Sequence, residues 1–109
     1  MREIKAIVRT DRLEEVLHAL HAIEGLPGIT ISVVRGVGRT HGGDAETTGF
    51  GEVQMAKLEI VVEAELENPV VDTIVRTAST GRPGDGKIFV YPVARVVRIR
   101  TSEEDAEAL

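Results

Sequence analysis

Hydrophobic and polar positions alternate in several short stretches of the chain. From residue 3 to residue 9, Ile4, Ala6 and Val8 stand two apart, which is the period of a β-strand. Residues 28–34 and 57–63 alternate in the same way and are rich in β-branched side chains. Two further stretches, 87–91 and 93–99, are strand-like and separated by Pro92.

Two other stretches have apolar residues at helical spacing. The first has a start like a capping box at Asp11 and ends before Gly25. The second starts at Asn68 and Pro69, which suit an N-cap and a first helical turn, and ends at Gly81. The pattern therefore predicts one helix after the first strand and one after the third.

The element order β-α-β-β-α-β predicts an α+β, ferredoxin-like fold for residues 1–109 as a single domain. Right-handed crossovers would place both helices on one face of a four-stranded antiparallel sheet. Ile7, Val34 and Val61 then give the other face apolar positions, which suggests that several copies pack together. We expect a homotrimer.

The chain departs from this regular pattern at a long loop and at its end. Residues 37–56 are rich in glycine, threonine and charge, and a loop of that length in a small domain is usually functional or disordered. The acidic residues 101–109 are expected to fray.

Composition narrows the classes of function. The 109 residues carry a net charge of −5, which argues against nucleic acid as a partner. The absence of cysteine excludes thiolate chemistry and cysteine-bound metals. The N-terminal stretch is charged every two or three residues and no stretch is long and apolar, so we expect no membrane insertion and a cytoplasmic location.

Residues 81–87 have the spacing G-x-x-x-x-G-K of a nucleotide-binding P-loop. A P-loop lies between a strand and a helix and continues with Ser or Thr, whereas here a helix precedes, a strand follows and the next residue is Ile88. Two interpretations stay open: an anion-binding loop with Lys87 beside it, or a plain glycine-rich turn. Without a nucleophile or base beside this loop, a phosphohydrolase is the weakest hypothesis.

Three other groups are candidates for binding. Gly36 to Arg39 form a weaker glycine segment. Arg98 and Arg100 would share a face of the last strand and suit a phosphate, or else protect an exposed sheet edge. His18 and His21 lack a nearby third metal ligand, which leaves His41 in the long loop as a metal candidate.

The segment from residue 75 to residue 101, with VRTASTGRPGDGKIFV and VARVVRIRT, closely resembles the PII nitrogen-regulatory signal-transduction family. Residues 1–20 and 34–39 support the resemblance. It implies trimers of ferredoxin-like subunits with ATP or ADP, and Mg²⁺ accompanying ATP, in clefts between neighbours. It also implies that residues 37–56 are the T-loop, which docks on a target protein, and that residues 81–87 are the B-loop.

The resemblance assigns nucleotide-binding residues by position. One side of the cleft would take Gly36, Val37, Gly38 and Arg39, with Ile7 and Thr30 near the adenine and Val61 among the lining residues. The neighbouring subunit would supply, for the phosphates, Gly84, Asp85, Gly86, Lys87, Arg98 and Arg100. The residues expected to meet a partner protein are Thr40, His41, Asp44, Glu46 and Phe50.

The chain departs from the family pattern at two effector positions and one modification site. Thr40 stands where a glutamine is usual, and a lysine position aligns near Met55, which weakens the case for 2-oxoglutarate. The T-loop tyrosine is missing. From the resemblance as a whole we expect a non-enzymatic nucleotide sensor that acts on a partner such as a transporter or an enzyme. The alternative is a trimeric scaffold or a metal-responsive module that uses His41, Asp44 and Glu46.

Overall fold

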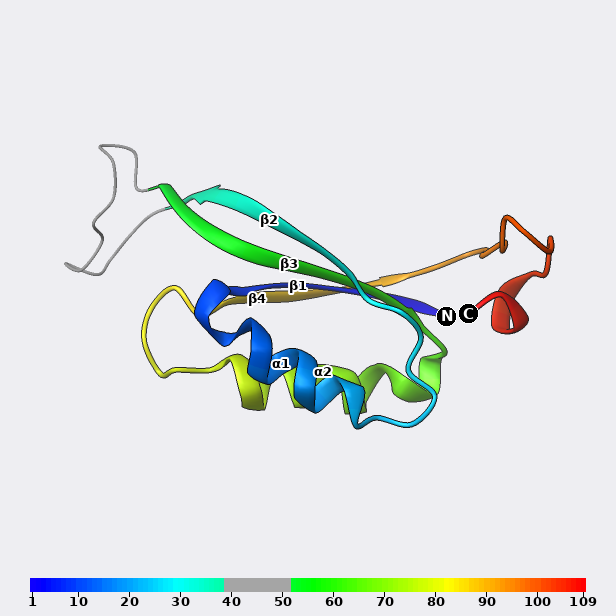
Figure 1. Cartoon of the computed structure of the whole chain (residues 1–109), viewed down its shortest axis with the longest axis horizontal. Helices are drawn as coiled ribbons and strands as arrows, with labels where there is room; N and C mark the ends of the chain where they lie inside the picture. Colours follow the sequence, from blue (N-terminus) through cyan, green and yellow to red (C-terminus); the bar gives the residue numbers. More distant parts are fainter. Residues whose placement is uncertain (39–51) are drawn as a thin grey trace.

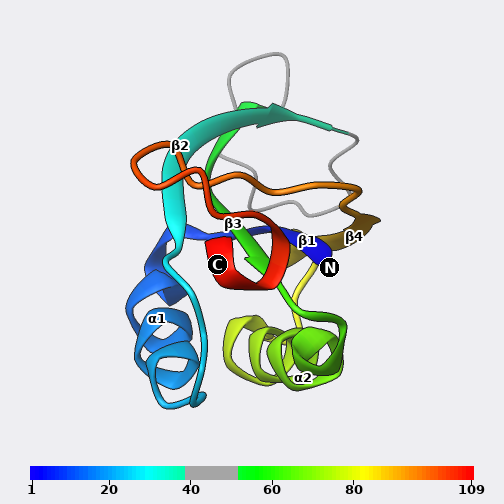
Figure 2. The ribbon, with the colours of Figure 1, turned by 90° about the vertical axis from the view of Figure 1, so that its right-hand side faces the viewer.

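The structure is a computed structural model, and it describes residues 1–38 and 52–109. Four strands form one antiparallel sheet in the order β2-β3-β1-β4. They are β1 (Arg2–Arg9), β2 (Thr30–Val37), β3 (Glu52–Val62) and β4 (Gly86–Pro92). The helices α1 (Leu13–His21) and α2 (Glu67–Ala78) both lie on one face of the sheet (Figures 1 and 2). The predicted α+β, ferredoxin-like architecture is confirmed.

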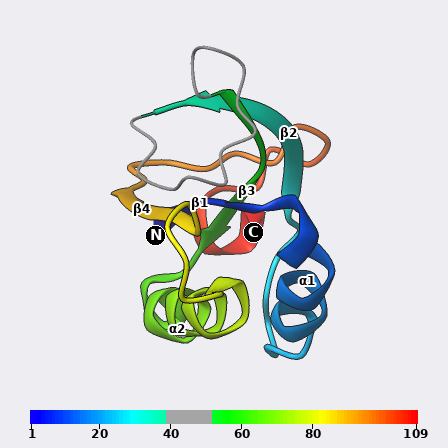
Figure 3. The ribbon, with the colours of Figure 1, turned by 90° about the vertical axis from the view of Figure 1, so that its left-hand side faces the viewer.

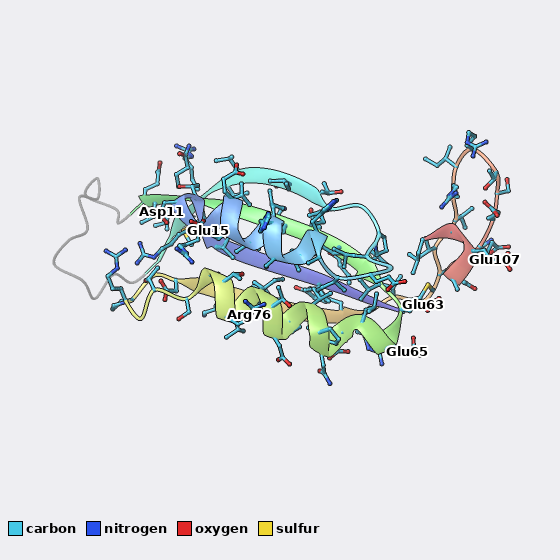
Figure 4. The ribbon with its side chains drawn as sticks, turned by 60° about the horizontal axis from the view of Figure 1, so that its bottom comes forward. Asp11, Glu15, Glu63, Glu65, Arg76 and Glu107 are labelled. Carbon is cyan, nitrogen blue, oxygen red and sulfur yellow. The ribbon has the colours of Figure 1, made fainter. Side chains whose placement is uncertain are left out.

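The core lies between this sheet and the two helices. Alternate residues of β1 and β3 face the helices and are fully buried, and Val16, Leu20, Val70 and Ile74 meet them from the helices. All these side chains are aliphatic, and no polar or charged side chain in the described part of the chain is buried. Each fully buried Val, Leu or Ile contributes roughly 1.5–3 kcal/mol. Polar helix residues such as Glu15 and Arg76 lie on the outer surface (Figure 4).

The helix ends differ from the predicted ones. A short 3-10 turn, Thr10–Arg12, precedes α1, and neither helix has a side-chain hydrogen bond at its N-cap. The Arg12 guanidinium instead donates to the carbonyl oxygen of Thr77, at 3.0 Å from Nε and 2.7 Å from Nη2. That carbonyl belongs to the last turn of α2, where the backbone has no intrahelical donor. A side chain at the start of α1 therefore supplies the hydrogen-bond donor for a carbonyl group at the end of α2.

Strand β3 begins earlier than predicted. Residues 52–56, which were assigned to the long loop, pair with the end of β2 from Val37↔Glu52 to Val33↔Ala56. Met55 and Ala56 are buried. Their own sequence alternates weakly, so the strand is stabilised by pairing with a distant segment rather than by local preference. The remainder of the predicted loop, residues 39–51, lies outside the described residues.

The end of the chain also differs from the prediction. Strand β4 stops at Pro92, which has no N–H for the ladder, and residues 93–99 form no continuous strand. The chain instead turns back, with Val97 bridging to Glu104, and ends in a 3-10 turn, Asp105–Ala108. We call residues 93–109 the C-terminal hairpin. It lies near the start of β1 (Figures 1 and 2), where the Val93 amide donates to the Met1 carbonyl at 3.1 Å.

Candidate functional site

The glycine-rich segment 79–86, which we call the glycine loop, lies at one end of the sheet. It joins α2 to β4, and it enters the sheet where Gly86 pairs with Val8 and Lys87 pairs with Ile7 (Figure 3). The end of β2 lies at the same end of the sheet, since Gly36 pairs with Val53 beyond the last residue of β1. The two glycine segments predicted from the sequence therefore share one end of the molecule.

Gly86 is required by the way the glycine loop joins the sheet. Its φ is +103°, a conformation that side chains disfavour, and a Cβ there would lie 1.7 Å from the carbonyl oxygen of Ile7. The backbones of Gly86 and Ile7 are therefore in direct contact, with no side chain between them.

Two residues earlier in the loop, the Gly84 amide has no hydrogen-bond partner among the described residues. An exposed, unpaired amide of this kind can receive an anion.

Asp85 holds the glycine loop together from inside. Its Oδ2 accepts from the amides of Thr80 at 2.8 Å and Gly81 at 3.1 Å, and its Oδ1 accepts from the Thr80 hydroxyl and from Arg9 Nε, the latter at 2.8 Å. The hydroxyl of Thr80 and then the guanidinium of Arg9 hold the pKa of the Asp85 carboxyl well below its ordinary value. A carboxylate with four donors has little capacity left for a ligand or a metal ion.

Lys87 lies beside this loop and carries a positive charge that is unpaired among the described residues. Its side chain is exposed on the face of the sheet away from the helices, opposite Ile7 in the register. It makes no ion pair with any carboxylate of residues 1–38 and 52–109. An amide and an ammonium group without internal partners give this end of the sheet the chemistry of an anion site.

A second group of predicted site residues meets at the other end of the sheet. Thr30, Val61 and Arg98 line one groove of about 590 Å³ between the C-terminal hairpin and the face of the sheet away from the helices. The other residues that line it are Glu3, Pro27, Gly28, Glu59, Ala108 and Leu109. In the register, Val61 pairs with Glu3, four residues before Ile7 along β1.

The predicted arrangement of Arg98 and Arg100 on one strand face is wrong. Arg98 lies in the C-terminal hairpin, and its Nη2 donates to the main-chain oxygens of Ala108 at 3.4 Å and Leu109 at 3.0 Å. Its Nη1 lies 3.7 Å from Glu103 Oε1. Arg100 is in the exposed turn of the hairpin. The expectation of a fraying end is also wrong, because Glu103, Ala108 and Leu109 contact Arg98 and residues 105–108 form a 3-10 turn.

The structure therefore gathers the predicted site residues into two sets. Arg39, Thr40, His41, Asp44, Glu46 and Phe50 lie outside the described residues, so the metal-responsive alternative is untested. Within the described ranges, no three His, Asp or Glu side chains are grouped so as to hold a metal ion. The same ranges hold no helix long and apolar enough to cross a membrane.

Sequence reasoning missed two residues of the glycine loop's network, Arg9 and Thr80. Arg9 ends β1 and is 76 positions from Asp85, so no local motif connects them. Thr80 carried a usable signal. A threonine before a glycine-rich turn that contains an aspartate is typical of loops held by side chain to backbone hydrogen bonds.

By its sheet order and its helices, the chain belongs to the class of ferredoxin-like domains. The family profile described as "Nitrogen regulatory protein P-II" matches residues 1–103. The chain is 44% identical to nitrogen regulatory protein P-II 1 of Escherichia coli K12 and 46% identical to nitrogen regulatory protein P-II of Microchaete diplosiphon, with each chain covered completely. The structure of Arabidopsis thaliana PII bound to citrate is similar, with a TM-score of 0.84 and 41% identity over 99% of this chain and 91% of that one.

These comparisons show the family. The chain belongs to the nitrogen regulatory protein P-II family, and the resemblance found from its motifs is confirmed.

Proposed function

We propose that three copies of this chain form a trimer that binds ATP or ADP in the clefts between neighbours and so regulates a partner protein. The observation that carries the proposal is the separation of the candidate site residues within one chain. Ile7, Gly84, Gly86 and Lys87 lie at one end of the sheet, and Thr30, Val61 and Arg98 line a groove toward the other end.

The spacing of residues along β1 measures this separation. Ile7 pairs with Lys87, whereas Glu3 shares the groove with Arg98. Four residues of strand span about 13 Å, and the Arg98 guanidinium is held by the main-chain oxygens of Ala108 and Leu109 in the groove at the far end of that span, which disfavours one phosphate touching Lys87 and Arg98 of the same chain. We infer that Lys87 of one chain meets Arg98 of its neighbour. This grouping differs from the sequence-based assignment, which takes both residues from one subunit.

The outer face of the sheet supports association. Ile7, Val34 and Val61 lie on the face away from the helices, as their register partners Lys57, Met55 and Glu3 do, and all three are only half-buried in the single chain. Copies of the chain that pack these faces together would remove apolar surface from water. The trimer is the state that we propose from the family resemblance.

The ligand class follows from the charges and amides. The Lys87 ammonium group and the Gly84 amide, neither of which has a partner among the described residues, and the Arg98 guanidinium fit a polyanion. The related Arabidopsis thaliana protein is described as bound to citrate, which is itself a polyanion. We propose ATP and ADP as the ligands here. Because Asp85 already has four donors, we assign no magnesium ligand among the described residues.

Signalling would use the segment that leaves the sheet beside the glycine loop. The β2–β3 hairpin runs past the end of β1 as far as the pair Val37↔Glu52, and residues 38–51 of the predicted T-loop connect these two partners along the chain. ATP and ADP shift that segment only if they bind its arrangements with different affinity. We propose that the difference controls docking on a transporter or an enzyme and that the protein itself performs no catalysis.

Calorimetric titration tests nucleotide binding. We expect ATP and ADP to bind below 1 mM, roughly the affinity at which a binding free energy exceeds 4 kcal/mol. Lys87→Ala and Arg98→Ala should each weaken ATP by about tenfold or more, since each loses hydrogen bonds to a charged group. Absence of binding to the unmodified protein would overturn the nucleotide site.

Mixing two variants tests the proposed grouping. A trimer that contains both Lys87→Ala and Arg98→Ala chains has one cleft with both residues intact. In that cleft the Arg98→Ala chain supplies Lys87, and the neighbouring Lys87→Ala chain supplies Arg98. Unfolding and refolding the mixture should therefore recover part of the wild-type ATP binding that neither variant shows alone. If both residues acted from the same chain, mixing would recover none. Refolding each variant separately is the control.

A further inference from the structure

Arg9 connects the last residue of β1 to two points of the glycine loop. Its Nε donates to Asp85 Oδ1 at 2.8 Å, and its Nη2 donates to the carbonyl oxygen of Pro83 at 2.7 Å. Both charged side chains of the pair are mostly covered, with 22% and 24% exposed. The loop is therefore held to the sheet by a guanidinium as well as by the strand pairing that begins at Gly86.

We propose that Arg9 and Asp85 are positioning residues, which fix the shape of the glycine loop so that the Gly84 amide and Lys87 face one anion. This inference rests on the proposed nucleotide site. Asp85 would act on the nucleotide through the loop and would not touch it. The family resemblance had placed Asp85 among the binding residues, so the inference changes its role.

The direction of the hydrogen bonds supports this role. Asp85 accepts from the amides of Thr80 and Gly81, and the Thr80 hydroxyl accepts from the amide of Arg82 at 3.3 Å. Three successive amides are thus directed to side chains inside the loop. The Gly84 amide has no such partner among the described residues and stays available.

The charges of Asp85 and Arg9 also support the positioning role. A carboxylate inside a loop that receives a phosphate would repel that phosphate unless a cation neutralised it. Arg9 supplies the cation at 2.8 Å, so the positive charges of Arg82 and Lys87, which form no ion pair among the described residues, are in excess at the loop. The planar fork of arginine can donate to a carboxylate and a carbonyl together, which the single ammonium group of lysine does less well.

Two kinds of measurement test the inference. The variants are Arg9→Met, Asp85→Asn and the double variant, and the readouts are affinity for ATP and for AMP and the hydrogen exchange of the Thr80 and Gly81 amides. We expect each single variant to bind ATP about 10- to 100-fold more weakly, the range for hydrogen bonds to charged groups. The double variant should bind no more weakly than the worse single variant, because both remove one interaction.

The chain offers a matched control at the other end of the same strand. Arg2 Nε lies 3.1 Å from Glu67 Oε1, an arginine–carboxylate ion pair through the same guanidinium nitrogen and somewhat more exposed, at 37% and 33%. Arg2→Met should leave ATP affinity within about twofold of wild type, as distant sites act independently. Loss of ATP affinity in Arg9→Met should exceed loss of AMP affinity, since AMP lacks the outer phosphates. A merely structural defect would lower both equally.

The outcomes separate this inference from the proposed function. If the unmodified protein binds neither ATP nor ADP, the nucleotide site is overturned, and the Thr80 and Gly81 amides still decide whether Arg9 holds the loop. If Arg9→Met and Asp85→Asn leave both the amide exchange and the ATP affinity within twofold, the positioning role is overturned. Faster exchange together with weaker ATP binding supports it.

Discussion

Gly86 and Ile7 approach so closely that their backbones leave no room for a side chain, since a Cβ on Gly86 would lie 1.7 Å from the Ile7 carbonyl oxygen. The contact fixes where the glycine loop enters the sheet. It also places Lys87 on the same face as Ile7, because the two residues are register partners.

Replacement of Gly86 by alanine is expected to destabilise the fold by at least about 2 kcal/mol, from a strained positive φ together with a backbone clash. Urea unfolding followed by circular dichroism measures it. Gly81→Ala is the matched control for φ alone, since Gly81 has φ +79° and open space around it. It should cost only about 1 kcal/mol. Equal losses in the two variants would contradict the close contact.

Arg12→Ala should lower the free energy of unfolding by about 1–2 kcal/mol, because it leaves the Thr77 carbonyl at the end of α2 without its donor. Arg76 lies one position away on α2 with an exposed side chain and no hydrogen bond among the described residues (Figure 4). Arg76→Ala is therefore the control and should change stability by less than about 0.5 kcal/mol. The same unfolding titration compares the two.

Asp85 makes the stability of the fold depend on pH in the acid range. Its carboxyl pKa is lower in the folded chain than its ordinary value of 3.8, so its contribution to stability is present above that value and is lost as the pH falls below it. Asp85→Asn should be less stable than wild type at pH 7, and the difference should shrink below about pH 4. Thermal melts between pH 7 and pH 2.5 measure this. A difference that stays constant across that range would contradict the assignment.

Deletion of residues 106–109 is expected to strengthen ATP binding by about 3- to 10-fold. Arg98 now donates to the main-chain oxygens of Ala108 and Leu109, and these acceptors compete with a phosphate for one guanidinium. Asp105 stays in place, which keeps its amide's hydrogen bond to Val96 and preserves the hairpin. Calorimetry on the shortened chain gives the answer. Weaker binding would mean that the deleted residues support the groove instead.

The sequence predicted the fold well where local pattern and buried surface agree. Ile4, Ala6 and Val8 alternate in β1 and are buried together against the helices, so period and packing point to the same face. It failed for residues 52–56, whose strand depends on pairing with β2, and at the ends of the helices. Arg12 shows why: the group that satisfies α2 lies 65 positions away and leaves no local signal.

The candidate site was predicted less completely. Lys87 and the glycines were found because their spacing is itself a motif. Arg9 was not found, because its role depends on its hydrogen bond to Asp85, and the two residues come into contact only in the folded chain. Arg98 was found as a residue but was placed on a strand, because the short-range alternation of residues 93–99 concealed the turn of the C-terminal hairpin.

The two ends of the sheet also have a consequence for gene dosage. In the proposed trimer, each chain would contribute its glycine loop to one cleft and its Arg98 groove to the next, and so would take part in two clefts at once. In a cell that makes equal amounts of wild-type chain and of a chain defective at both ends, roughly a quarter of the clefts would be assembled from intact halves, whereas a site within one chain would leave about half. A damaged copy of this protein would therefore be partly dominant over a healthy one.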